Sequence, residues 1–249
     1  RGHWVKALES EMKSLQDQGV LRPEEPPKGP NVEIIDSKTV PKLKKQADNT
    51  VDKHKIRFCA RGCFQRYGVS YDETFAPTTQ LLSIRLLLIL SLIWSLTVHH
   101  VDVATAFLNS PLSYDIWIKL PKGFTGMGDF KHAKLMKSLY GLKQAAKDWF
   151  DLQNEFILGF DPRFKRSVVE PCLYYIHDTD MGLIVLVLVY VDDYMIATND
   201  PDYYTKFLSS FQKRFTVNEL GPLSFVMQMS VKWVNGGVEL CQQRHITDL

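Results

Sequence analysis

Cysteine is scarce in this sequence, and charge of one sign does not dominate. The four cysteines lack both the density of a secreted disulfide framework and the paired C-x2-C spacing of a zinc site. The 30 basic and 28 acidic residues leave a formal net charge of +2, so overall charge points to neither a nucleic acid nor a membrane as partner. We therefore expect an intracellular protein, not a secreted one, and only local clusters of charge could indicate a nucleic-acid or membrane partner.

A long uncharged apolar run is also missing. The most apolar stretch, residues 81–98, contains Arg85, and the uncharged part that follows is shorter than the roughly 20 residues that a membrane span needs. This predicts a buried core helix and no membrane association, with a membrane-associated protein built on this stretch as the alternative. The sequence begins with neither an initiator Met nor a signal peptide, which favours a piece of a longer polypeptide.

Apolar residues make up 45% of the 249 residues, enough for a sizeable core in one large domain or two small ones. Their spacing changes between helical and strand periods along the chain, which predicts an α+β protein. In chain order we expect a helix over 4–15, a loop to about 52, a strand over 54–62, the buried helix within 81–98, a strand over 98–103, a helix over 138–160 that begins at Ser138, two strands within 183–198, a helix after Asp200, and a strand over 224–233 that turns back at 235–237.

Residues 54–62, HKIRFCARG, alternate between polar and apolar side chains. In a strand, Lys55, Arg57, Cys59 and Arg61 would share one face and the apolar residues the other. A face with three cations requires an anionic partner or solvent.

Residues 187–197, VLVYVDDYMIA, place Asp192 and Asp193 at the turn between two apolar strands. Ionised carboxylates are costly to bury, so an adjacent pair there normally shares a proton, meets a basic partner or holds a metal ion. Asp102, on the strand predicted over 98–103, is a third candidate. Three carboxylates and a basic strand fit two-metal phosphoryl transfer with Mg²⁺. Spacing alone does not bring Asp102 to Asp192, and Asp102 could equally cap a strand end.

Five segments, taken in order, resemble the reverse transcriptase domain of copia-type LTR retrotransposon polyproteins. They read KIRFCARGCFQRYGVSYDETFAPT, VDVATAFLNSPL, IKLPKGF, KSLYGLKQAAKDWF and YVDDYMIAT, and the resemblance runs from about Trp4 to the last residue. It implies an α+β right-hand polymerase fold of fingers and palm, with mixed helices and an antiparallel palm sheet. Residues 1–249 would form the reverse transcriptase domain, about 1–80 mainly fingers and about 81–249 mainly palm with finger insertions, while a thumb and a ribonuclease H domain would be absent.

The implied activity is RNA-directed DNA synthesis, in which a nucleotide is transferred from a dNTP to a primer 3′-hydroxyl. Two Mg²⁺ ions would serve as cofactors, with Mn²⁺ as a substitute. The implied partners are an RNA template, a DNA primer, dNTP, and the integrase and ribonuclease H domains of the same polyprotein, in a cytoplasmic retrotransposon particle.

The resemblance also implies roles for individual residues. The catalytic carboxylates and metal ligands would be Asp102, Asp192 and Asp193, with Asp102 and Asp192 as the main ligands. The nucleotide-binding residues would be Lys55, Arg57 and Arg61 on the triphosphate, Phe107 against the sugar, and Gln144 near the nucleotide.

Several positions depart from the family pattern. The family usually has Phe at Cys63, Pro at Ala146 and a Trp near Thr39, and none of these positions is expected to touch the metals. In LSFVMQMSV, residues 223–231, Gln228 stands where the family has a Gly, a residue usually chosen for backbone freedom or close approach. Because that hairpin is expected to hold the primer, the alternative function is a decayed or domesticated nucleic-acid-binding remnant without polymerase activity.

Overall fold

The computed structural model describes residues 2–29, 32–45, 51–122, 124, 126–243 and 246. The chain divides into two compact units, which are considered separately. The first comprises Arg1–Ala76 and Phe107–Asp151, and the second comprises Pro77–Ala106 and Leu152–Leu249. Both contain helices and mainly antiparallel strands, as the α+β prediction requires.

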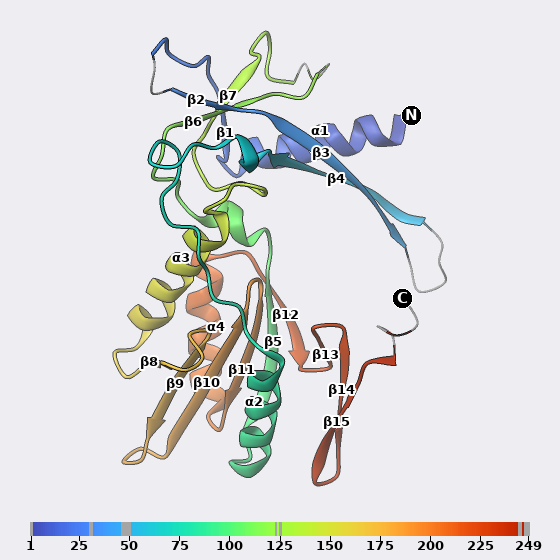
Figure 1. The fold of residues 1–249 in the computed structure, drawn as a ribbon. Coiled ribbons are helices and arrows are strands. Elements are labelled where there is room, and N and C mark those ends of the chain that lie inside the picture. Colours follow the sequence, from blue (N-terminus) through green and yellow to red (C-terminus); the bar gives the residue numbers. More distant parts are fainter. Residues whose placement is uncertain are drawn as a thin grey trace. The chain divides into compact units, whose positions relative to one another are not determined.

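The first unit contains a four-stranded sheet, a long two-stranded ribbon and a helix (Figure 1). Among the strands that the structure describes, β2 and β6 pair in parallel and the others pair antiparallel. The core lies between the sheet, the helix and the base of the ribbon, where Met12, Phe58 and Ile118 are buried together. The elements are α1 (Gly2–Asp17), β1 (Leu21–Pro23), β2 (Glu33–Ile35), β3 (Ser37–Lys45), β4 (Val51–Ala60), the 3₁₀ turns η1 (Gly62–Phe64) and η2 (Ala106–Asn109, whose first residue belongs to the second unit), β6 (Ile116–Lys119), β7 (His132–Leu135) and the start of α3 (Ala145–Phe160).

The expectation of a loop to about residue 52 is wrong, because three strands form there. Their partners lie far along the chain or across a turn: Leu21 pairs with Leu135, Glu33 with Ile116, and β3 with β4. The basic strand begins earlier than expected and ends at Ala60, so Arg61 lies just outside it, where the chain turns into η1.

The helix predicted from Ser138 begins at Ala145 instead. The preceding segment runs beside the end of β4, where the Ala60 amide donates to the Tyr140 carbonyl at 2.8 Å. Gly141 makes this approach possible: its φ is +89°, and a Cβ there would lie 2.2 Å from the Ala60 carbonyl oxygen. Ser138 donates a hydrogen bond to Asp148 in the first turn of α3.

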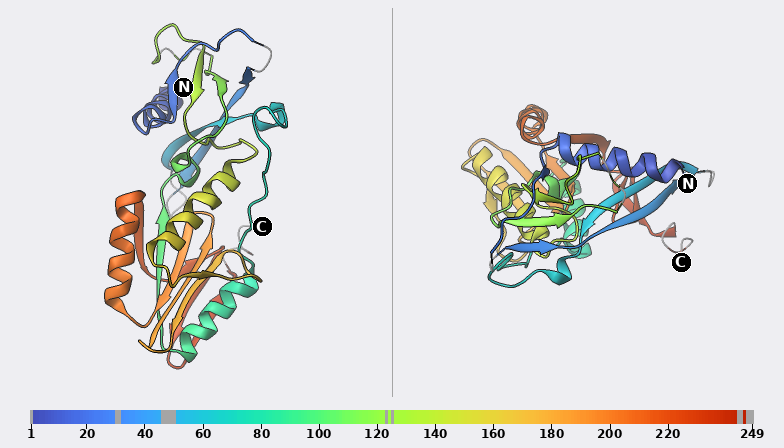
Figure 2. Two further views of the ribbon diagram at one scale, coloured as in Figure 1. Left: turned by 90° about the vertical axis from the view of Figure 1, so that its left-hand side faces the viewer. Right: turned by 90° about the horizontal axis from the view of Figure 1, so that it is seen from above.

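The second unit is built on a six-stranded antiparallel sheet in the order β12-β5-β11-β10-β9-β8. The C-terminal part of α3 lies with the whole of α4 along one face of this sheet, and α2 lies along the other (Figures 1 and 2). Cover on both faces explains why β10 is almost entirely apolar. The elements are α2 (Leu81–Ile93), β5 (Thr97–Val103), β8 (Lys165–Arg166), β9 (Leu173–Asp178), β10 (Leu183–Tyr190), β11 (Asp193–Thr198), α4 (Pro201–Arg214), β12 (Val217–Pro222), β13 (Phe225–Val226), β14 (Met229–Val234) and β15 (Gly237–Cys241).

Aromatic rings fill the space between α3, α4 and the sheet. Phe156 of α3 lies 5.2 Å from the ring of Phe211 in α4, which lies 4.7 Å from Tyr194 of β11. Asp200 caps α4 by accepting hydrogen bonds from the amides of Asp202 and Tyr203, as the sequence predicts.

The helix α2 is half-buried, not buried as predicted. Ile84, Leu87 and Leu88 pack on the sheet, whereas Leu82 and Ile93 on the outer face are 70% and 67% exposed. Among the described residues, no helix is both long and apolar enough to cross a membrane.

The strand predicted over 224–233 is divided by a turn into β13 and β14. Met227 and Gln228 form this two-residue turn, and both have positive φ, 45° and 62°. The following turn at 235–236 joins β14 to β15, as the sequence predicts.

Candidate active site

The hairpin of β10 and β11 presents the two adjacent aspartates. Tyr190 pairs with Asp193, which leaves Val191 and Asp192 as a two-residue turn. Val191 has a φ of 56°, a conformation that costs energy for a β-branched residue and that occurs where the surrounding structure enforces it. The sequence therefore predicts this hairpin correctly, and Asp192 is exposed at its tip.

The third aspartate lies on the neighbouring strand. Asp102 of β5 pairs directly with Asp193 of β11, so their side chains leave the same face of the sheet. The amide of Val103 donates to the Asp192 carbonyl at 2.8 Å, which ties the tip of the hairpin to the end of β5. The fold thus places Asp102 directly beside Asp193 and next to the turn that carries Asp192, an arrangement that spacing alone could not establish.

Two further residues hold these carboxylates. His100 Nε2 donates to Asp193 Oδ1 at 2.7 Å, and the imidazole is nearly buried, with 9% of its side chain exposed. Asn218 of β12 donates to Asp102 Oδ2 at 3.1 Å. Sequence reasoning missed both residues, although His100 precedes Asp102 by two positions and therefore shares its face of the strand.

The donor set suits a hard divalent cation. Carboxylate oxygens are the ligands that Mg²⁺ prefers, and this ion is commonly held by one or two carboxylates together with water and substrate phosphates. Asp102 and Asp193 supply such a pair on the adjacent inner strands β5 and β11, where both side chains are partly exposed. Across the described ranges, no three acidic, histidine or cysteine side chains are close enough to hold an ion unaided, so water and substrate oxygens would supply the remaining ligands.

The residues expected to bind nucleotide lie in the first unit. Arg57 of β4 is exposed, and its guanidinium lies 5.2 Å from the centre of the Tyr140 ring. Arg61 is exposed beside Phe64, with its guanidinium 4.7 Å from that ring, and it forms a long ion pair of 3.9 Å with Asp36. Lys55 lies on β4 two residues before Arg57 and is half-buried.

Phe107 and Gln144 are more enclosed than their expected roles suggest. Phe107 is half-buried and packs edge to face on Tyr140, with ring centres 5.5 Å apart. Gln144 is 2% exposed, and its amide nitrogen donates to the Ser70 carbonyl at 3.0 Å while its amide oxygen accepts from Gln65. Its observed contacts position the segment that contains Gln65 and Ser70.

Comparison with known proteins gives a consistent match. The family described as "Reverse transcriptase (RNA-dependent DNA polymerase)" matches residues 25–249. A "Retrovirus-related Pol polyprotein from transposon TNT 1-94" of Nicotiana tabacum is 35% identical over 229 residues, which cover 91% of this chain and 17% of the relative. The corresponding polyprotein from transposon RE1 of Arabidopsis thaliana is 33% identical over 225 residues, which cover 90% of this chain and 15% of that relative.

Among solved structures, a foamy viral protease-reverse transcriptase in complex with double-stranded DNA is 12% identical, with a TM-score of 0.49. The match covers 98% of this chain and 36% of that one.

Proposed function

The chain belongs to the reverse transcriptase (RNA-dependent DNA polymerase) family, and from this we infer that it is the polymerase part of a copia-type Pol polyprotein. In this proposal it adds nucleotides from dNTP to a DNA primer on an RNA template. The observation that carries the proposal is the direct pairing of Asp102 with Asp193 beside the turn that carries Asp192. We assign the first unit to the fingers and the second to the palm.

In the palm, Asp102 and Asp192 would be the main metal ligands, with Asp193 as the third carboxylate. Two Mg²⁺ ions, replaceable by Mn²⁺, would activate the primer 3′-hydroxyl and stabilise the pyrophosphate that leaves. His100 would act as a positioning residue, because its hydrogen bond fixes one oxygen of Asp193. Asn218 engages one oxygen of Asp102 in the same way.

In the fingers, Lys55, Arg57 and Arg61 would bind the triphosphate through charge-assisted hydrogen bonds. The exposure of both arginines supports this role. Phe107 would contact the sugar, and the edge-to-face packing of its ring on Tyr140 would hold the ring in place for that contact. Gln144 would shape the nucleotide site by holding the backbone of Ser70.

The proposed setting is a retrotransposon particle in the cytoplasm, where integrase and ribonuclease H domains of the same polyprotein would accompany this chain. The family match supports that setting, since the relatives are Pol polyproteins of which this chain covers 17% and 15%.

Primer extension tests the proposal. On an oligo(dT) primer annealed to poly(rA), we expect the purified chain to lengthen the primer with dTTP in the presence of Mg²⁺ or Mn²⁺, and EDTA should abolish the reaction. Omission of the template is the control. A folded protein that binds the primed template but adds no nucleotide with either metal would contradict the proposal and support the nucleic-acid-binding remnant.

A further inference from the structure

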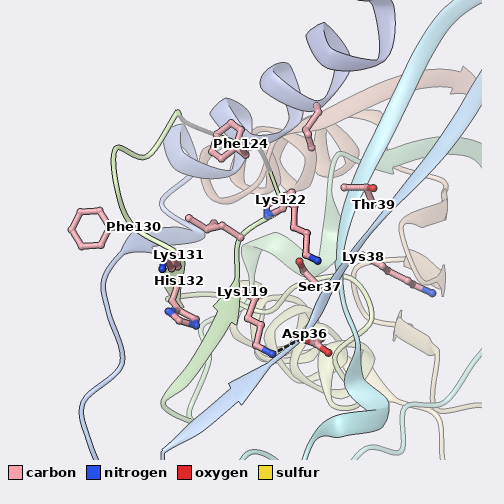
Figure 3. A pocket seen from close by; sticks show the side chains of 13 residues that line it. Asp36, Ser37, Lys38, Thr39, Lys119, Lys122, Phe124, Phe130, Lys131 and His132 are labelled. Atoms are coloured by element: carbon pink, nitrogen blue, oxygen red, sulfur yellow. Dashed lines mark ion pairs between the residues drawn. The ribbon is translucent and has the colours of Figure 1, made fainter. Parts of the chain in front are cut away.

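A cavity of about 860 Å³ lies in the first unit, where the Lys119 ammonium forms an ion pair of 2.8 Å with Asp36 (Figure 3). All the residues that line this cavity belong to the first unit, whereas the three carboxylates belong to the second. The hairpin that carries Asp192 and Asp193 is held by contacts within the second unit, and a buried hydroxyl is prominent among them.

The strand β10 loses one of its neighbours before it reaches its turn. Its pairing with β9 ends where Leu188 faces Leu173, whereas its pairing with β11 continues to Tyr190. The amide of Val189 still donates to the Cys172 carbonyl at 3.0 Å. The carbonyl of Val189 points to the same side of the strand, and the residue is 1% exposed. A buried carbonyl beyond the end of the β9 pairing requires a donor from another segment.

Thr79 supplies this donor. Its hydroxyl donates to the Val189 carbonyl at 2.5 Å, and the residue is 4% exposed. The bond lies three residues before Asp192 and two before Val191, whose φ of 56° persists only where the surrounding structure enforces it. The hydroxyl therefore completes the hydrogen bonding of β10 where β9 no longer does.

The position of Thr79 is itself fixed by the first turn of α2. Glu170, in the loop between β8 and β9, accepts from the amide of Gln80 at 3.3 Å and from the hydroxyl of Ser83. The Cys172 amide donates to the same carboxylate at 3.2 Å. Thr79 is thus anchored to the segment of chain that also meets the end of β10.

We propose that Thr79 is a positioning residue for nucleotide addition, because its hydroxyl holds the tip of the hairpin that carries Asp192 and Asp193. A misplacement of about 1 Å can cost about a hundredfold in rate, so a hydrogen bond three residues from a catalytic carboxylate can determine its efficiency. The role in the reaction rests on the proposed function, whereas the support of the hairpin does not.

Hydrogen–deuterium exchange, measured without primer, nucleotide or divalent metal, tests the support of the hairpin. We expect Thr79→Val, which replaces the hydroxyl by a methyl group, to speed exchange of the amides of residues 189–194 about tenfold, because the tip opens more often. Thr79→Ser keeps the hydroxyl and should exchange as the wild type does. Thr78→Val is the matched control, because Thr78 is the exposed neighbour. Ser83→Ala loosens the anchor of Thr79 without a new methyl group beside Val189, so it should speed the same amides by a smaller factor.

Single-turnover addition of dTTP on a primed RNA template tests the role in the reaction. Thr79→Val should lower the maximal rate about tenfold and leave the dTTP concentration at half-maximal rate unchanged, because the residues expected to bind the triphosphate lie in the first unit. Thr79→Ser should restore the rate, and Thr78→Val should retain it.

Three results would overturn the inference: wild-type exchange in both Thr79→Val and Ser83→Ala, exchange in Thr79→Val that speeds as much throughout β5 and β9 as at the hairpin, or a wild-type maximal rate in a Thr79→Val variant whose hairpin exchanges faster. The second would make Thr79 a general contributor to stability. Conversely, a wild-type chain that extends no primer but shows the expected changes in exchange would contradict the proposed function alone.

Discussion

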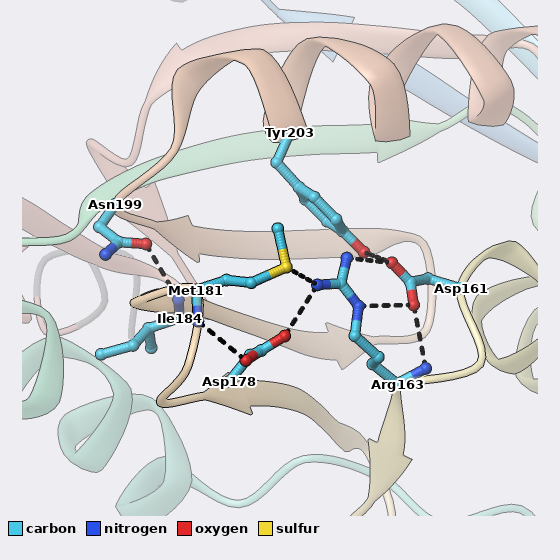
Figure 4. Close-up of polar contacts among 7 residues, drawn as sticks. All are labelled: Asp161, Arg163, Asp178, Met181, Ile184, Asn199 and Tyr203. Carbon is cyan, nitrogen blue, oxygen red and sulfur yellow. Dashed lines mark hydrogen bonds and ion pairs between the residues drawn. The ribbon is translucent and has the colours of Figure 1, made fainter.

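The carboxylate of Asp161, in the second unit, accepts several hydrogen bonds, which Figure 4 shows. Its Oδ2 accepts from Arg163 Nη2 at 2.8 Å and from the Tyr203 hydroxyl at 3.1 Å, and 14% of its side chain is exposed. Arg163 also pairs with Asp178 at 3.0 Å, so this network joins the segment after α3 to β9 and α4. The hydrogen bonds from Arg163 are the main cause that lowers the pKa of Asp161 from 3.8 to about 2.

The lowered pKa predicts a pH-dependent contribution to stability. Because the folded protein holds Asp161 ionised more strongly than the unfolded chain does, the contribution is complete above about pH 4 and is lost as pH falls toward 2. We expect Asp161→Asn to lower the free energy of unfolding by on the order of 2 kcal/mol at pH 6, with a smaller difference from wild type at pH 3.

Urea denaturation at the two pH values measures this difference. Asp180→Asn, in the exposed turn between β9 and β10, is the control and should match wild type at both. A difference for Asp161→Asn that is the same at pH 6 and pH 3 would show that lost packing, not ionisation, causes the effect.

At the scale of elements, the turn between β13 and β14 has an unfavourable sequence. Two-residue hairpin turns with two positive φ values normally contain Asn, Asp or Gly, whereas this turn contains Met227 and Gln228. A side chain in the left-handed region costs roughly 1–2 kcal/mol, a penalty that a Gly at position 228 would avoid.

We predict that Gln228→Gly raises the free energy of unfolding by about 1 kcal/mol, because Gly adopts this φ without the steric penalty. The measurement is chemical denaturation of the variant beside wild type. Gln228→Ala removes the same side chain but keeps Cβ, so it should bring no such gain. If Ala and Gly stabilise equally, the side chain of Gln228 and not its backbone conformation is unfavourable.

This turn also shows where sequence reasoning stops. Alternation predicts one strand over 224–233, but Val226 pairs with Met229 across the two-residue turn, so residues of opposite parity share a face. Val226 and Met229 are buried whereas Phe225 is exposed, and the sequence pattern contains no sign of this change of face. Helical spacing likewise extends back to Ser138, whereas the close approach of Gly141 to Ala60 determines the structure there. That contact joins residues far apart in the sequence, and no local pattern contains it.

Elements whose stability is local were predicted well. The helix α1, the capped helix α4 and the hairpin of β10 and β11 have boundaries set by spacing, capping and turn residues. The short strands β1 and β2 were missed because their pairing partners lie on β7 and β6, much later in the chain.

At the scale of the whole molecule, the sequence identifies the candidate residues but not their grouping. Asp102, Asp192 and Asp193 lie in the second unit, and the five residues expected at the nucleotide lie in the first. The pairing of Asp102 with Asp193 follows from strand register, which spacing along one chain does not specify. The positioning roles of His100 and Asn218 depend on the same register, because His100 contacts Asp193 and Asn218 contacts Asp102. The sequence shows neither contact.

The most direct test of the proposed polymerase is the single-turnover rate of dTTP addition by Asp102→Asn and Asp192→Asn on a primed RNA template with Mg²⁺. Each variant loses one ligand charge, so we predict a rate lower by about a thousandfold, equivalent to ~4 kcal/mol of activation free energy, with an unchanged melting temperature. Asp180→Asn is the charge-matched control and should retain the wild-type rate. Nucleotide addition at the wild-type rate by a folded Asp102→Asn or Asp192→Asn variant would contradict the account.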